Sequence, residues 1–159
     1  MPRQLETHPL TPAAFAAFGT VIEARSEAAL EIDQGFTTRF HALAEVAAGP
    51  NGKAMLSLLR GRPRPLQIDL LERHPLSSRA FMPLGGRPWL VVVADTPRAE
   101  TCRAFRVRGD QGVQYHPGVW HHPLLVLDEP QDFLVVERAG PGTNLEEVRL
   151  AAPLELRPA

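Results

Sequence analysis

The chain has 159 residues, 44% of them hydrophobic, which is enough for one globular domain with a substantial core, and we expect a single domain over 1–159. Its formal net charge of -1 provides no strong field to attract nucleic acid or an acidic membrane surface. One cysteine, Cys102, excludes an internal disulfide and a thiolate metal cage. The N-terminal segment lacks the apolar run of a signal peptide, and no stretch reaches transmembrane length, so we expect a cytoplasmic protein.

A short helix is predicted near the N-terminus. Thr11 is a favoured N-cap residue, Pro12 suits the first helical position, and Gly19 provides a C-terminal stop after an apolar run. Beyond this segment helical periodicity is scarce, which argues against a helical bundle.

The rest of the chain contains short β-prone runs separated by turn residues. Seven such runs are predicted as strands: 20–23, 54–59, 66–71, 89–94, 102–108, 123–127 and 132–137. The 16 prolines are about twice the usual share. Many short strands with glycine and proline between them indicate an all-β, mainly antiparallel sandwich or barrel.

Three of the predicted strands are apolar without alternation, at 90–93, 124–127 and 133–136. Such strands are expected to be buried on both faces. In a small barrel only one of those faces points to the interior. The other must meet a helix, a flanking sheet or a second subunit, and we therefore predict a homodimer.

A carboxylate and an imidazole end the run at 66–71. At spacing i, i+2 on a strand, Glu72 and His74 project from the same face, while Arg73 points away. These side chains are suited to bind a divalent metal or to transfer protons near neutral pH. A solvent-exposed pair at a strand end is the alternative.

A second cluster places His116, His121 and His122 within seven residues. Gly118 permits a sharp turn between them, and Trp120 supplies a large rigid wall. His121 and His122 are adjacent, so they are expected on opposite faces of a strand and at most one enters a pocket. His116, before the turn, can come back toward the site. The two clusters are expected to form two walls of one pocket.

Any carboxylate-binding cation here is expected to be a guanidinium, since Lys53 is the only lysine. Arg39 shares a strand face with His41 and is a candidate for the pocket, although an ion-paired surface arginine is the more frequent outcome. The three arginines of segment 60–64 flank prolines, and such a basic loop is typical of a solvated surface.

The two clusters partly match the motifs of cupin barrels, which are H-x-H followed by a carboxylate, and then P-x-G-x-x-H. Residues 118–121 fit the end of the second motif and give His121 its histidine position. Glu72 stands in the first motif where its first histidine would be. The later carboxylate falls at or near Arg79, which cannot ligate a metal.

A closer resemblance covers nearly the whole chain. Its phrases, in chain order, lie at 10–12, 39–41, 72–76, 80–84, 89–94, 115–124 and 137–140. Together they resemble ureidoglycolate lyase, also called ureidoglycolate hydrolase, a cupin-like family of allantoin degradation. The resemblance implies a cupin-like β-barrel with a short N-terminal helix. The chain departs from the family pattern at Arg79, where glutamine is usual, and at Leu145, where cysteine is usual.

The resemblance also implies an activity, the cleavage of (S)-ureidoglycolate to glyoxylate and urea. That reaction needs a base for the hydroxyl proton, an acid for the departing nitrogen and a cation for the carboxylate. The expected catalytic residues are Glu72, His74, His116 and His121, and the expected substrate-binding residues are Arg39, Arg79 and Trp120. Family members are associated with a divalent metal, often nickel, whose expected ligands are Glu72, His74 and His121. Whether the metal is required stays open.

Two functions of other classes stay open from the sequence. One is a metal-dependent cupin oxygenase that acts on another small acid and consumes oxygen. The other is a non-catalytic cupin that binds a small carboxylate. The second would keep the arginines but tolerate the loss of His74 and His121. In each case the expected partner is a small molecule and neither nucleic acid nor a membrane.

Overall fold

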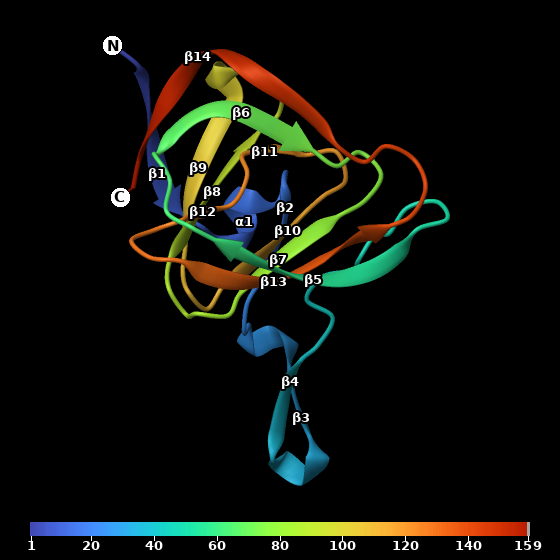
Figure 1. Cartoon of the computed structure of the whole chain (residues 1–159). Helices are drawn as coiled ribbons and strands as arrows, with labels where there is room; N and C mark the ends of the chain where they lie inside the picture. The colour runs from blue at the N-terminus through green and yellow to red at the C-terminus, as the bar shows by residue number, and fades with distance from the viewer. Residues whose placement is uncertain (159) are drawn as a thin grey trace.

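The computed structural model describes residues 1–158 and consists mainly of β-strands (Figure 1). A seven-stranded sheet has the order β11 (Trp120–His121), β6 (Gln67–Arg73), β14 (Glu146–Arg157), β1 (Arg3–Pro9), β9 (Cys102–Val107), β8 (Trp89–Ala94) and β12 (Leu125–Val126). A five-stranded sheet has the order β2 (Gly19–Ile22), β10 (Gly112–Tyr115), β7 (Arg79–Pro83), β13 (Gln131–Ala139) and β5 (Lys53–Gly61). Strands β3 (Ala29–Ile32) and β4 (Thr37–Phe40) form a separate pair. The helical segments are α1 (Pro12–Phe15) and the 3-10 turns Ser26–Ala28, Asp33–Gly35 and Ala99–Thr101.

The seven-stranded sheet closes on itself, because β11 pairs with β8 as well as with β6. Most neighbouring strands in this ring are antiparallel, and β1 is parallel to both β14 and β9. A hydrophobic cluster shared by strands of both sheets joins the five-stranded sheet to the ring. The prediction of an all-β, mainly antiparallel barrel with a short N-terminal helix is confirmed.

Strand β8 is buried on both faces, as its unbroken apolar run predicted. Val91 and Val93 belong to the core between the two sheets, whereas Val92 and Ala94 belong to a second core formed by ring strands. Both faces are therefore covered by the chain itself. The double-sided burial that suggested a second subunit is satisfied without one.

Helix α1 begins as predicted but is shorter. The Thr11 hydroxyl accepts a hydrogen bond from the Ala14 N–H, and Pro12 occupies the first turn. The helix ends at Phe15, which is fully buried. Gly19 does not cap the helix; it begins β2, where a Cβ atom would lie 2.0 Å from the Gln114 carbonyl oxygen. Glycine is required there by the close approach of β10.

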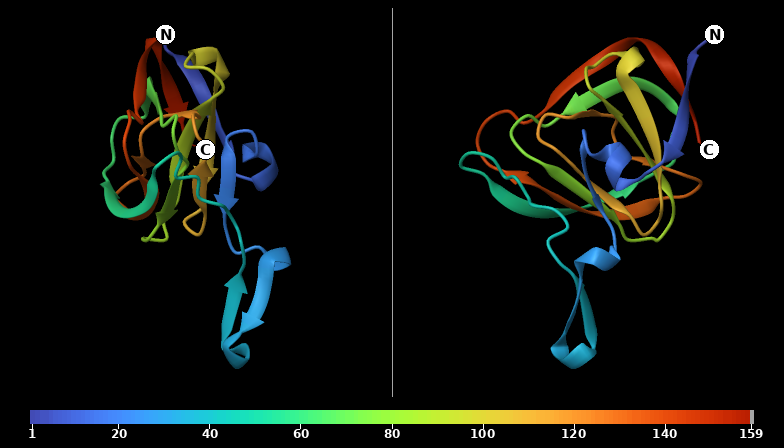
Figure 2. Two further views of the ribbon diagram at one scale, coloured as in Figure 1. Left: turned by 90° about the vertical axis from the view of Figure 1, so that its right-hand side faces the viewer. Right: turned by 180° about the vertical axis from the view of Figure 1, so that it is seen from behind.

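The β3–β4 pair forms a hairpin that projects away from the barrel in every view (Figure 1, Figure 2). Every residue of its two strands is exposed. Its exposed apolar side chains are Leu30, Ile32, Phe36 and Phe40. A two-stranded hairpin without further packing is marginally stable in water. Among residues 1–158, no helix is long and apolar enough to cross a membrane.

Candidate active site

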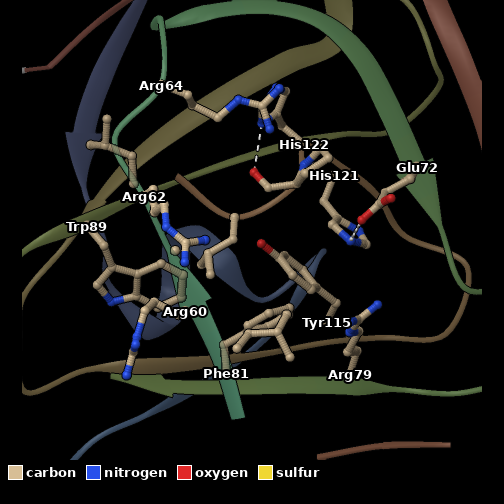
Figure 3. A pocket seen from close by; sticks show the side chains of 15 residues that line it. Arg60, Arg62, Arg64, Glu72, Arg79, Phe81, Trp89, Tyr115, His121 and His122 are labelled. Carbon is tan, nitrogen blue, oxygen red and sulfur yellow. Dashed lines mark hydrogen bonds and ion pairs between the residues drawn. The ribbon is translucent and has the colours of Figure 1, made fainter. Parts of the chain in front are cut away.

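A cavity of about 300 Å³ opens between the two sheets (Figure 3). Strands β5, β6, β7, β8, β10 and β11 contribute to its wall, together with the segments that follow β5 and β11. The lining residues that carry polar groups are Arg60, Arg62, Arg64, Glu72, Arg79, Trp89, Tyr115, His121 and His122. A small cavity with so many charged side chains in its wall suits a compact, charged substrate.

Glu72 and His121 form the central pair of the site. They are direct partners in the antiparallel pairing of β6 and β11, which brings the His121 Nε2 atom within 3.5 Å of a Glu72 carboxylate oxygen. His121 Nδ1 donates to the Val119 carbonyl at 3.0 Å, so Nε2 is the atom available for proton exchange. Burial raises the pKa of Glu72, but the interaction with His121 and the nearby positive charges outweigh it and bring this pKa below 4.5. The carboxylate is therefore ionised at neutral pH.

His74 is held by hydrogen bonds at both ring nitrogens. Nδ1 lies 2.8 Å from the Asn144 carbonyl oxygen, which can only accept, so this nitrogen carries the proton. Nε2 lies 2.9 Å from Arg79 Nη1, a permanent donor, and therefore accepts. Burial lowers the pKa of His74, and the Arg79 charge adds to this effect against the Asn144 bond. His74 is thus a neutral imidazole with one defined tautomer.

The turn at Gly118 fixes the position of His74. Gly118 adopts a φ of +79°, a backbone conformation that favours glycine, and its N–H donates to the His74 carbonyl at 2.9 Å. On the other side, the Asn144 side chain accepts from the Leu76 N–H at 2.7 Å and donates to the Ser77 hydroxyl at 2.8 Å. Two separate loops therefore hold the segment after β6.

Tyr115 forms one wall of the cavity and stacks on His121. The two rings lie 4.2 Å apart at an interplanar angle of 11°. Tyr115 is the cross-strand partner of Arg79 on β7, which places both on the face that lines the cavity. Burial, assisted by the Glu72 charge, raises the pKa of Tyr115 well above its ordinary value. Its phenol is a stable hydrogen-bond donor toward a ligand.

Arginine side chains line the rest of the cavity, on the side of β5 (Figure 3). Arg60 forms an exposed ion pair with Asp132, with a separation of 2.7 Å between nitrogen and oxygen. Arg62 and Arg64 follow in an exposed segment without regular secondary structure, and both line the cavity. His122 lines the cavity with them; its Nδ1 donates to the Pro123 carbonyl at 2.7 Å, and its buried Nε2 has no hydrogen-bond partner among residues 1–158.

Glu72, His74 and His121 form a group that could hold a metal ion. Each offers one ligand atom, and the three atoms lie within 4.8 Å of one another. The His74 and His121 ring centroids are 5.4 Å apart. The spacing of the group therefore suits an ion with nitrogen and oxygen ligands.

Comparison with known proteins agrees with the resemblance found in the sequence. The family model described as ureidoglycolate lyase matches residues 2–157. The chain belongs to the ureidoglycolate lyase family. The ureidoglycolate lyase of Rhizobium leguminosarum bv. trifolii (strain WSM2304) is 51% identical over 158 residues, covering 96% of this chain and 95% of that protein. That of Pseudomonas syringae pv. syringae (strain B728a) is 52% identical over 151 residues, covering 91% and 89%.

Among solved structures, an oxalate decarboxylase matches with a TM-score of 0.40 and 14% identity, over 80% of this chain and 37% of that one. The expected enzyme class for this family member, a carbon–nitrogen lyase, is confirmed by the family model and the relatives.

The structure brings together some of the ureidoglycolate lyase residues expected from the sequence and not others. Glu72, His121 and Arg79 line one cavity, and His74 contacts Arg79 beside it. Three expected residues lie elsewhere: Arg39, His116 and Trp120. Arg39 is exposed on the projecting hairpin, and His116 is exposed, with Nε2 3.2 Å from the Ala16 carbonyl oxygen. Trp120 packs in the second core under the Arg73 guanidinium, 4.6 Å from its ring centroid.

Part of the lining of this cavity was not predicted from the sequence. Tyr115 lies in the segment 115–124, which carries the family resemblance, but no role was predicted for it. The arginines of segment 60–64 are exposed, as expected, but they also line the cavity, which their i, i+2, i+4 spacing could have indicated. His121 and His122 both line the cavity, because β11 is only two residues long and strand alternation does not continue past it.

Proposed function

We propose that the chain cleaves (S)-ureidoglycolate to glyoxylate and urea, and that residues 1–159 form one domain for this purpose. The observation that carries the proposal is a cavity with several cations along one side and a carboxylate–imidazole pair at the other. The substrate has the matching layout, a carboxylate beside a carbon that bears a hydroxyl and a ureido group. The name of the family supports the same substrate.

The carboxylate of the substrate is assigned to Arg62 and Arg64. Neither is engaged by an ion pair among the described residues, whereas Arg60 is paired with Asp132 and Arg79 with Glu137 at 3.1 Å. A guanidinium can hold a carboxylate through two parallel hydrogen bonds. The carboxylate-binding role that was expected of Arg39 and Arg79 is therefore assigned to the segment that follows β5.

The family resemblance implies nickel, so the residues are tested against such an ion. Glu72 and His121 fit, because an ionised oxygen and a free Nε2 face each other. His74 does not fit, because Nδ1 carries the proton bonded to Asn144 and the Nε2 lone pair accepts from Arg79. We therefore assign no step of the reaction to a metal.

The Glu72–His121 pair is assigned the proton transfers. His121 Nε2 accepts the hydroxyl proton of the substrate, and the neighbouring Glu72 carboxylate stabilises the imidazolium that forms. The oxygen lone pair then forms the glyoxylate carbonyl, and the C–N bonding electrons pass to the departing nitrogen. Because oxygen and nitrogen are bonded to the same carbon, the imidazolium can return the proton to that nitrogen and release urea. The Tyr115 phenol is positioned to donate a hydrogen bond to the ureido carbonyl.

The test is an assay with metal-stripped and nickel-loaded protein, following glyoxylate, urea and dissolved oxygen. We expect equal amounts of glyoxylate and urea from the stripped protein, without oxygen consumption.

Arg64→Gln should raise KM at least about tenfold with a smaller change in kcat, since a charged hydrogen-bonded contact is lost. Oxygen uptake would favour the oxygenase, and substrate binding without either product would favour the non-catalytic alternative.

We also propose that the protein is a homodimer, on a different basis from the one used for the sequence. The β3–β4 hairpin exposes four large apolar side chains and makes no sheet with the barrel. Packing against a second copy would remove this surface from water.

A further inference from the structure

The conflict between Arg79 and a metal begins with the atoms of His74. A neutral imidazole has one N–H and one lone pair, and it can ligate a metal only through the lone pair. Here the N–H points to the Asn144 carbonyl at 2.8 Å, and the lone pair receives an Arg79 N–H at 2.9 Å. A metal at this group would have to displace the guanidinium from Nε2.

Arg79 is firmly held in this position. Its Nη2 atom lies 3.1 Å from a Glu137 carboxylate oxygen, and the side chains of both residues are about four-fifths buried. Glu137 is fixed in turn by the Ser57 hydroxyl at 2.9 Å, and the Arg79 guanidinium lies 5.4 Å from the Phe81 ring centroid. Moving Arg79 away would leave Glu137 as a mostly buried carboxylate without its cation, which is costly.

We infer that Arg79 is the resident cation of this site and that it excludes a metal ion held by Glu72, His74 and His121. A guanidinium cannot be deprotonated and keeps its charge at every working pH. It therefore supplies a fixed positive charge beside the Glu72–His121 pair without a metal. The inference concerns the same cavity as the proposed function but stands on its geometry, whichever substrate is turned over.

The test measures metal binding directly by isothermal titration calorimetry with Ni²⁺ on folded, metal-stripped protein. Arg79→Gln frees the His74 lone pair, because the shorter, uncharged side chain stays polar but does not reach as far as the guanidinium. We expect it to bind one Ni²⁺ at least about tenfold more tightly than wild type, the scale on which neighbouring groups tune metal affinity. The double variant Arg79→Gln with His74→Ala should lose this gain, because the third ligand is gone.

Arg60→Gln is the matched control, since it removes the same charge from the same cavity without touching His74. It should bind Ni²⁺ as wild type does. Equal affinity of wild type and Arg79→Gln would overturn the inference. An equal gain in Ni²⁺ affinity in Arg60→Gln would also overturn it, because the gain would then follow from the loss of one positive charge alone. Neither result bears on glyoxylate production, so the proposed function is judged separately.

Two measurements keep the inference testable if Arg79→Gln does not fold. Adding Glu137→Gln removes the carboxylate that the first change leaves unpaired. In wild type, nitrogen-15 NMR of the histidine rings should show His74 as the Nδ1–H tautomer, unchanged when Zn²⁺ is added. A shift of the His74 Nε2 resonance on Zn²⁺ addition, as expected for a ligated nitrogen, would contradict the exclusion of metal.

Discussion

At the scale of single residues, His121 and His122 are adjacent and both line the cavity, but their surroundings differ. His121 is stacked on Tyr115 and faces Glu72, whereas His122 lies beside the arginines. We expect His121→Ala to lower kcat by about a hundredfold or more, since an acid–base group is lost. His122→Ala should raise KM and leave kcat within a few-fold. Steady-state kinetics on both folded variants checks this, and the reverse pattern would invert the assignment.

Buried imidazoles also make stability depend on pH. Burial lowers the pKa of His122 below 6.5, and the Arg64 charge adds to this effect, opposed by the Pro123 bond and nearby carboxylates. His74 is lowered in the same direction. Below pH 6.5 these two histidines therefore bind more protons in the unfolded chain than in the folded chain. As a result, the free energy of unfolding falls as pH decreases through this range. Glu72 acts in a separate pH range, below 4.5. Because its pKa is lower in the folded chain, its protonation in that range favours unfolding.

Urea denaturation at about pH 7.5 and 5.5 measures this effect. Wild type should lose stability between the two values, and His122→Asn should lose less, because asparagine can still donate to the Pro123 carbonyl but does not titrate. Replacing the solvated His8 in the same way is the control and should leave the difference unchanged. A pH dependence identical in wild type and His122→Asn would mean that His122 titrates like an exposed imidazole.

At the scale of elements, β11 shows why a residue expected in the pocket lies outside it. The register that points His121 toward Glu72 sends Trp120 into the second core, where it is 7% exposed. We expect Trp120→Ala to cost about 3–5 kcal/mol of unfolding free energy, with KM nearly unchanged in the folded fraction. Trp120→Phe should cost less. Chemical denaturation and steady-state kinetics of the same variants check this. A raised KM without loss of stability would indicate that Trp120 contacts the substrate after all.

Elements with clear periodicity could be predicted, and elements set by long-range pairing could not. The apolar run of β8 and the i, i+2 spacing of Glu72 and His74 needed only local rules. Strand β14 has alternating apolar residues but contains Pro153, which argues against a strand unless the ladder is interrupted. The register does shift between Arg149 and Leu154. No local pattern indicates that His121 pairs with both Glu72 and Val93.

At the scale of the whole molecule, the projecting hairpin is the surface on which the proposed dimer rests. Phe36, at its tip, is 91% exposed. We expect sedimentation at micromolar concentration to give a dimer of the 17.5 kDa chain, and Phe36→Ser to raise its dissociation constant at least about tenfold. Leu84→Ser removes an apolar side chain that is 58% exposed and lies outside the hairpin, and it should have no effect. A monomeric wild type, or equal effects of both changes, would contradict this interface.

The closed ring also constrains when the chain can complete its fold during synthesis. Strand β1 completes the ring only through β14, and the Thr7 hydroxyl donates to the Arg157 carbonyl across 150 residues of sequence. At about 5–20 residues per second, a ribosome needs roughly 8–30 s to make that stretch. In the last part of this interval, once β8 and β9 have been made, their apolar residues that face the second core lack the strand that will cover them. The nascent chain is therefore most exposed to aggregation before its last strand emerges, and this is when a chaperone would protect it.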